Sequence, residues 1–314
     1  MIPRKAFENL LNQRETKKIS LIIGARQVGK STILNALYDK LCIEQKNKGL
    51  LLDLDIFSNY EKVKSFEDAV NTLVINGFDK GKSFYLFLDE FQRFANLSLV
   101  LKNIYDHFDS IKVYASGSSP VKIKNFVQES LSGRKIITEI YPLDFEEFLR
   151  FREPEILNQL YNQEKMEGRN LSAATSNLRN LLNEFLIFGG YPEVALQKDS
   201  QNKIQVLTSI FDLYIKKDLA DYFQMNRLLA MKKLVEHLAI NNGQKIKYDE
   251  LSQITSLNYS QVLEHIGILE ESYIICNVRP FFTNKNKELV KIPKIYFLDN
   301  GVRNFFLNNF NLLS

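Results

Sequence analysis

Short apolar runs alternate with helix-compatible segments over the first 140 residues of this 314-residue chain. The runs are rich in Ile, Leu, Val, Phe and Tyr, and polar residues or glycine bound each of them. Continuous apolarity is typical of strands that are buried on both faces of a parallel sheet. We therefore predict an α/β fold with a five-stranded parallel sheet, whose strands are Ile19–Ile23, Leu50–Asp55, Phe84–Leu88, Ile111–Ala115 and Lys135–Ile140.

The first predicted strand leads into a phosphate-binding motif. Gly24–Ser31 fits the P-loop (Walker A) pattern G-x-x-x-x-G-K-[ST], and a helix-compatible run follows it. In such a loop, glycines let backbone N–H groups surround a phosphate, and the helix N-terminus adds partial positive charge. The predicted nucleotide-binding residues are Gly24, Ala25, Arg26, Gln27, Val28, Gly29, Lys30, Ser31 and Thr32.

Three residues of this motif have separate predicted roles. Lys30 is expected to contact the β- and γ-phosphates, and the hydroxyl of Ser31 is expected to coordinate Mg²⁺. Arg26 either contacts the nucleotide or pairs with a carboxylate of its own domain, and the second interpretation is favoured. We expect ATP rather than GTP, because no Asn-Lys-x-Asp motif follows the fourth predicted strand.

Two carboxylates end the third predicted strand. Asp89 is expected to hold Mg²⁺ through water, and Glu90 is expected to orient and polarise the attacking water. Asp53 and Asp55, at the end of the second predicted strand, are weaker candidates, because a solvated strand end has the same pattern.

The fourth predicted strand ends in the run Ser116–Ser119, where a polar side chain can contact the γ-phosphate. Ser116 is our catalytic candidate, although its spacing does not separate it from Ser118. A tight turn made of small residues is the alternative interpretation of this run.

Helices replace strands in the second half of the chain. The predicted domains are a P-loop core (1–150), a helical region (151–227) and a winged-helix-like domain (228–314), the last from its order of helix, strand, helix, helix and hairpin. Gly189–Pro192 is expected to end one helix of the helical region and begin the next.

The predicted third helix of the winged-helix pattern, which corresponds to a recognition helix, carries little positive charge. Residues 260–271 contain three glutamates and no Lys or Arg, and such a helix would be repelled by a phosphate backbone. Basic residues gather instead around the predicted wing: Arg279, Lys285, Lys287, Lys291 and Lys294. DNA contact through the wing is one interpretation, and docking against another domain or an unidentified protein partner is favoured over it.

Composition narrows the class of protein further. The chain has a net charge of +4, two cysteines and three histidines, none at metal-ligand spacing. It has no run of about 18 apolar residues, and its N-terminus lacks the apolar core of a secretory signal. We expect a cytoplasmic protein that does not span a membrane.

These motifs resemble a group of prokaryotic AAA-type ATPases of the AAA+ superfamily. The resemblance covers about residues 4–303 and rests on Gly24–Thr32, Leu88–Gln92, Ser116–Ser119, Ser132–Arg134, Tyr141–Leu149, Gly189–Glu193 and Lys294–Gly301. It implies an ATPase core, a helical lid and a C-terminal winged-helix domain of unknown role. Members usually continue into a nuclease-like region, but no matching carboxylate–lysine cluster is present here, so nuclease activity is not predicted.

The resemblance also implies a catalytic role for Arg134. In AAA-type rings, an arginine just before the fifth strand reaches the neighbouring subunit and stabilises charge on the γ-phosphate, which would require a homo-oligomer. The alternative is an ion pair of Arg134 within its own subunit.

The leading hypothesis is a Mg²⁺-dependent ATPase that couples ATP hydrolysis to movement of the lid and the winged helix. The alternative is a nucleotide-gated DNA-binding or signalling switch with little turnover.

Overall fold

The computed structural model describes residues 2–118, 131–161, 168–213, 225–281, 283 and 291–311. Its contacts divide the chain into two compact units, residues 1–25 with 29–140 and residues 26–28 with 141–314. The three-part division expected from the sequence remains a prediction. Within the described residues, no helix combines the length and the hydropathy that a membrane span needs.

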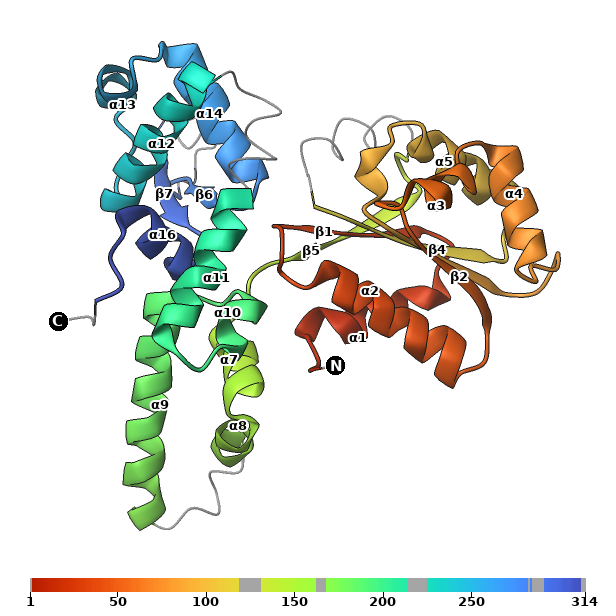
Figure 1. Ribbon diagram of the computed structural model, residues 1–314, viewed down its shortest axis with the longest axis horizontal. Helices are drawn as coiled ribbons and strands as arrows, with labels where there is room; N and C mark the ends of the chain where they lie inside the picture. The colour runs from red at the N-terminus through yellow and green to blue at the C-terminus, as the bar shows by residue number, and fades with distance from the viewer. Residues whose placement is uncertain are drawn as a thin grey trace. The chain divides into compact units, whose positions relative to one another are not determined.

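The first unit is built around a five-stranded parallel sheet in the order β2-β3-β4-β1-β5 (Figure 1). The α/β prediction is confirmed, and the predicted strand bounds differ from the observed ones by at most two residues. Every residue of the central strands β1 and β4 is buried, as continuous apolarity indicated. The strands are β1 (Ile19–Gly24), β2 (Lys48–Asp53), β3 (Phe84–Asp89), β4 (Ile111–Gly117) and β5 (Lys135–Ile140).

Helices cover both faces of this sheet, with α1 and α2 on one face and α3, α4 and α5 on the other (Figure 1). On the α4–α5 face, Leu21, Leu86 and Val113 from three neighbouring strands share one apolar cluster with Leu73 and Leu101. Full burial of such a side chain stabilises the fold by about 1.5–3 kcal/mol. The helices are α1 (Lys5–Asn12), α2 (Lys30–Tyr38), α3 (Phe57–Glu61), α4 (Phe66–Ile75) and α5 (Leu97–His107).

Aromatic rings fill the opposite face of the sheet. The rings of Phe87 and Tyr114 stack with centroids 5.2 Å apart, and Tyr38 of α2 meets Phe87 edge-on at 5.6 Å. The Tyr114 hydroxyl donates to the carbonyl of Leu10 in α1 over 3.0 Å. This buried hydrogen bond fixes α1 over the strands that carry the candidate site.

The second unit consists of helices and one small antiparallel sheet. β6 (Ile275–Val278) pairs with β7 (Lys294–Phe297), and Lys245 adds an isolated bridge to Lys294. The helices are α7 (Phe145–Arg152), α8 (Pro154–Tyr161), α9 (Gly168–Phe188), α10 (Pro192–Leu196), α11 (Ser200–Leu213), α12 (Met225–Ile240), α13 (Tyr248–Thr255), α14 (Tyr259–Glu271) and α16 (Asn300–Leu307). The sequence did not predict α16, which begins where the Asp299 carboxylate accepts a hydrogen bond from the N–H of Val302.

The glycine pair after α9 packs against the same carboxylate. α9 ends at Phe188 and α10 begins at Pro192, which confirms the predicted break between two helices. The N–H of Gly190 donates to Asp299 Oδ2 over 2.6 Å, and a Cβ on Gly189 would lie 2.0 Å from Asp299 Oδ1. Only glycine at position 189 permits this approach, because any larger residue would displace the carboxylate.

Candidate active site

The carboxyl ends of three neighbouring strands bring the predicted site residues to one edge of the sheet. β4 lies between β1 and β3, with Ile23 opposite Gly117 and Leu88 opposite Ala115. Strands in a sheet lie about 4.8 Å apart, so β1 and β3 are separated by about 10 Å. This edge therefore offers room for a phosphate group between the P-loop and Asp89.

The P-loop depends on its two glycines for different reasons. A Cβ on Gly24 would lie 2.1 Å from the carbonyl oxygen of Ile140 at the end of β5. Gly29 has a φ of 93°, a left-handed conformation that costs glycine little, and its carbonyl accepts the first α2 hydrogen bond, from Ile33. The loop therefore turns sharply from β1 into α2, whose N-terminal N–H groups face the sheet edge.

Lys30 is the buried cation of this loop. Its side chain is 5% exposed, and Nζ donates to the carbonyl of Ala25 over 2.5 Å. Of the other predicted nucleotide-binding residues, Ala25 and Val28 are buried, Arg26 and Ser31 are half-buried, and Gln27 and Thr32 are exposed. A buried ammonium group held by a carbonyl oxygen has the chemistry that a phosphate oxygen requires from its partner.

Asp89 and Ser116 form the first polar pair beside the loop. The Ser116 hydroxyl donates to Asp89 Oδ1, which also accepts the N–H of Glu90 over 3.1 Å. Ser116 is completely buried, so its hydroxyl has a fixed partner. Because no group of three or more His, Cys, Asp or Glu side chains in the described part of the chain can hold a metal by itself, a Mg²⁺ ion here would need phosphate oxygens as further ligands. The oxygens of Asp89 and Ser31 fit such an ion.

Glu90 belongs to a second polar group at the same edge. Ser118 Oγ donates to Glu90 Oε2 over 3.1 Å, and Nε2 of Gln92 also donates to Oε2. The two serines that the sequence could not separate thus have different partners. Gln92 was not among the predicted site residues, although it is the last residue of Leu88–Gln92, one of the motifs on which the family resemblance rests.

The acidic residues after β2 have local partners. Asp53 Oδ1 accepts the N–H of Asp55 over 2.9 Å, and Asp55 forms an ion pair with Arg93. Both carboxylates are exposed, in agreement with the weaker prediction made for them.

Arg134 lies at the opposite edge of the sheet. Its carbonyl accepts the N–H of Ile19, so it marks the amino ends of β1 and β5, and a six-residue strand of about 20 Å separates it from the P-loop of its own chain. Its guanidinium donates to both oxygens of Asp106, over 2.8 and 3.2 Å, which lowers the pKa of that carboxyl. Within one subunit, Arg134 therefore has a structural ion pair and no access to the phosphates.

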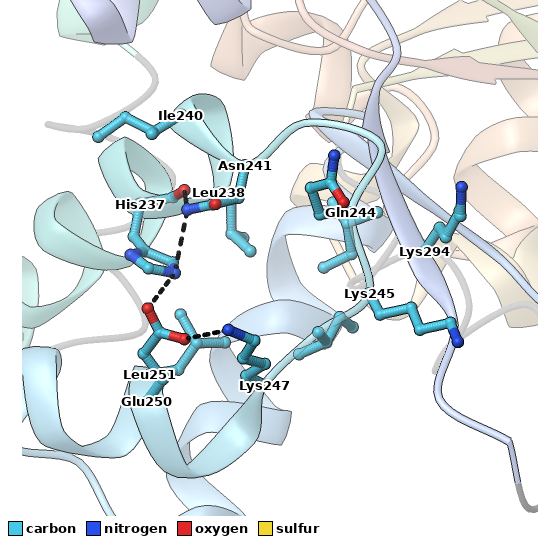
Figure 2. A pocket seen from close by; sticks show the side chains of 12 residues that line it. His237, Leu238, Ile240, Asn241, Gln244, Lys245, Lys247, Glu250, Leu251 and Lys294 are labelled. Carbon is cyan, nitrogen blue, oxygen red and sulfur yellow. Dashed lines mark hydrogen bonds and ion pairs between the residues drawn. The ribbon is translucent and has the colours of Figure 1, made fainter.

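A cavity of about 560 Å³ lies in the second unit, between α12, α13 and β7 (Figure 2). Figure 2 shows His237 and Glu250 facing each other, with 3.8 Å between Nε2 and Oε1, and Lys247 bound to the same carboxylate over 3.3 Å. Lys245 and Lys294 also line it, whereas Lys285 and Lys287 of the predicted wing lie outside the described residues.

Two family models match this chain, one in the part that contains the parallel sheet and one in the helical part. Residues 16–149 match the family model of an AAA domain, and residues 179–312 match a domain of unknown function (DUF8612). Two uncharacterized proteins of Methanocaldococcus jannaschii, MJ1544 and MJ1637, are 25% and 27% identical over 93% and 91% of this chain. The chain spans 62% of the length of each of these relatives.

A solved structure resembles this chain over nearly its whole length. The Walker-type ATPase paby2304 of Pyrococcus abyssi superposes with a TM-score of 0.62 at 14% sequence identity, over 98% of this chain and 96% of that one. At this identity the similarity shows the fold. Residues 16–149 therefore match the AAA-domain model and have a P-loop ATPase-like fold, and the helical region after them contains the match to the domain of unknown function.

Proposed function

We propose that this chain binds ATP with Mg²⁺ at Gly24–Thr32 and hydrolyses it. One observation carries the proposal: Ser116 of β4 and Ser118, which directly follows β4, donate hydrogen bonds to Asp89 and Glu90, respectively, beside the P-loop strand. A buried serine on each carboxylate fixes two acidic groups for two different tasks, which a solvated strand end would not need.

In this proposal, phosphate binding, Mg²⁺ binding and activation of water are carried out by different residues. The α2 N-terminus and Lys30 bind phosphate oxygens, and Lys30 exchanges the Ala25 carbonyl for them. Ser31 and Asp89 hold Mg²⁺, which when bound neutralises charge on the phosphates. Glu90 orients the attacking water and accepts its proton.

We further infer that α12–β7 is a winged helix, because α12, the Lys245 bridge, α13, α14, β6 and β7 follow one another in that order. Coupling of hydrolysis to movement of this domain and of the helices before it rests on this assignment. A cytoplasmic location and an unidentified protein partner remain predictions from the sequence.

A second candidate function is that of a nucleotide-gated switch that contacts a polyanion such as DNA. Lys245 and Lys294 lie directly opposite each other in an antiparallel bridge, and paired like charges destabilise a sheet unless an anion lies near. Binding to duplex DNA that vanishes between low and moderate salt, and that depends on ATP, would support this candidate. Absence of binding at low salt would remove it.

Steady-state ATPase assays test the first proposal. Lys30→Ala is expected to abolish nucleotide binding, whereas Glu90→Gln is expected to bind ATP with turnover lowered by about 10²–10⁴-fold. Glu61→Gln, which changes an exposed glutamate at the end of α3, is the matched control and should behave as wild type. Wild-type turnover in Glu90→Gln would contradict the assignment of the base.

A further inference from the structure

Gln92 is buried beside the carboxylate to which the proposed function assigns proton transfer. It lies in the one-turn 3₁₀ helix Phe91–Arg93, which directly follows Glu90, and its side chain is 7% exposed. Nε2 donates to Glu90 Oε2 and, over 3.3 Å, to Ser118 Oγ. Because a carboxylate only accepts hydrogen bonds, this contact fixes which end of the amide is nitrogen.

The oxygen of the same amide lacks a protein partner. Gln92 Oε1 is buried and accepts no hydrogen bond from any residue within the described ranges. A buried acceptor left without a donor destabilises the folded chain. Since Nε2 contacts Glu90, this bare oxygen lies next to the Glu90 carboxylate, where a water molecule would satisfy it.

The two oxygens of the Glu90 carboxylate differ in their hydrogen bonds. Ser118 and Gln92 both donate to Oε2, which fixes the plane of the carboxylate. The backbone of Glu90 has a φ of 54°, an uncommon left-handed conformation for a non-glycine residue, and such strain often accompanies a functional side chain. Oε1 of Glu90 thus remains to accept a proton.

We propose that Gln92 is a positioning residue for the hydrolytic water. Its Nε2 holds Oε2 of Glu90, and its Oε1 accepts one hydrogen bond of the water whose other proton faces Glu90 Oε1. The water oxygen then bonds to the γ-phosphorus, the bond from that phosphorus to the bridging oxygen of ADP breaks, and the proton passes to Glu90. This inference rests on the proposed ATPase function.

Replacement of the amide by an apolar side chain of equal length tests the proposal. Gln92→Met is expected to lower kcat about tenfold or more, with the Kd for ATP, measured with a fluorescent ATP analogue, unchanged within about twofold. In a Glu90→Gln background, the same substitution should lower kcat no further, because both residues act on one water. A merely structural role would lower kcat by the same factor in both backgrounds.

Gln13→Met is the matched control. Gln13 is 8% exposed in the same unit, donates to Thr138 Oγ1 over 3.0 Å, and also has a buried Oε1 without a partner among the described residues, but it contacts neither carboxylate. The Gln13→Met variant should lose about as much thermal stability as Gln92→Met and keep the wild-type kcat. If Gln92→Met does not fold, Gln92→Asn keeps the amide one methylene too short and should show the same loss of kcat.

The outcomes separate the two proposals. Wild-type kcat in a folded Gln92 variant, together with an inactive Glu90→Gln, would overturn the role of Gln92 and leave the ATPase proposal intact. A wild-type chain that binds ATP without turnover would overturn the ATPase proposal, and the role of Gln92 with it.

Discussion

At the residue scale, Ser116 and Ser118 stand two positions apart at the end of β4, and their side chains bond to different carboxylates. Ser116 donates to Asp89, the proposed Mg²⁺ ligand, and Ser118 donates to Glu90, the proposed base. Since groups that orient a metal ligand contribute to metal affinity, loss of the Ser116 hydroxyl should weaken Mg²⁺ binding.

Ser116→Ala is therefore expected to raise the Mg²⁺ concentration that half-saturates ATP hydrolysis by about tenfold. Titration of ATPase activity with Mg²⁺ at saturating ATP measures this. Ser98→Ala is the control, because Ser98 is also buried in the first unit but donates to the carbonyl of Ala95, just before its own helix α5. An unchanged Mg²⁺ titration in Ser116→Ala would contradict the role of Ser116 in orienting Asp89.

At the element scale, Asp299 joins the turn between α9 and α10 to the start of α16. Its carboxylate accepts N–H groups from both elements, those of Gly190 and Val302. Burial raises the pKa of this carboxyl to about 6, against the opposing effect of the N–H donors. The folded chain therefore binds a proton more tightly at this position than the unfolded chain does.

The free energy of unfolding should consequently fall as pH rises from about 4 to about 6, by about 3 kcal/mol for a shift of this size, with no further contribution from Asp299 above that window. Denaturant unfolding of wild type and Asp299→Asn across this range measures it, since the difference between the two removes the contributions of all other groups. If the difference in the free energy of unfolding between the two chains does not vary with pH, the pKa of Asp299 is not raised by folding.

At the scale of the whole molecule, Arg134 decides whether one chain can form a complete site. Its position at the amino ends of β1 and β5 separates it from its own P-loop, and Asp106 holds it there. A catalytic role for Arg134 thus requires a second chain.

Mixing Arg134→Ala with Lys30→Ala chains tests this role, because each mixed pair combines an intact P-loop with an intact arginine. If Arg134 acts between subunits, the mixture should hydrolyse ATP faster than the sum of the separate variants. Arg150→Ala removes an arginine of similar exposure that pairs with Glu146 and should retain activity alone. If mixing does not raise the ATPase rate and light scattering shows that the chain is a monomer, the role of Arg134 is its ion pair with Asp106.

The sequence by itself determined the five strands, the P-loop and the two carboxylates. These follow from local patterns, since apolar runs specify buried strands and the spacing of Gly24, Gly29 and Lys30 specifies one turn from strand to helix. The break at Gly189–Pro192 was likewise visible from residue types that end and begin helices.

Only the tertiary structure decided which polar groups meet. Ser116 reaches Asp89 across 27 positions of sequence, Gln92 reaches Ser118 across 26, and Gly190 reaches Asp299 across 109. The first two pairings depend on β4 lying beside β3, and the third depends on α16 returning to the end of α9. No local period encodes strand order or helix return, because both arise from burial of whole apolar faces rather than from the residues that make the contact.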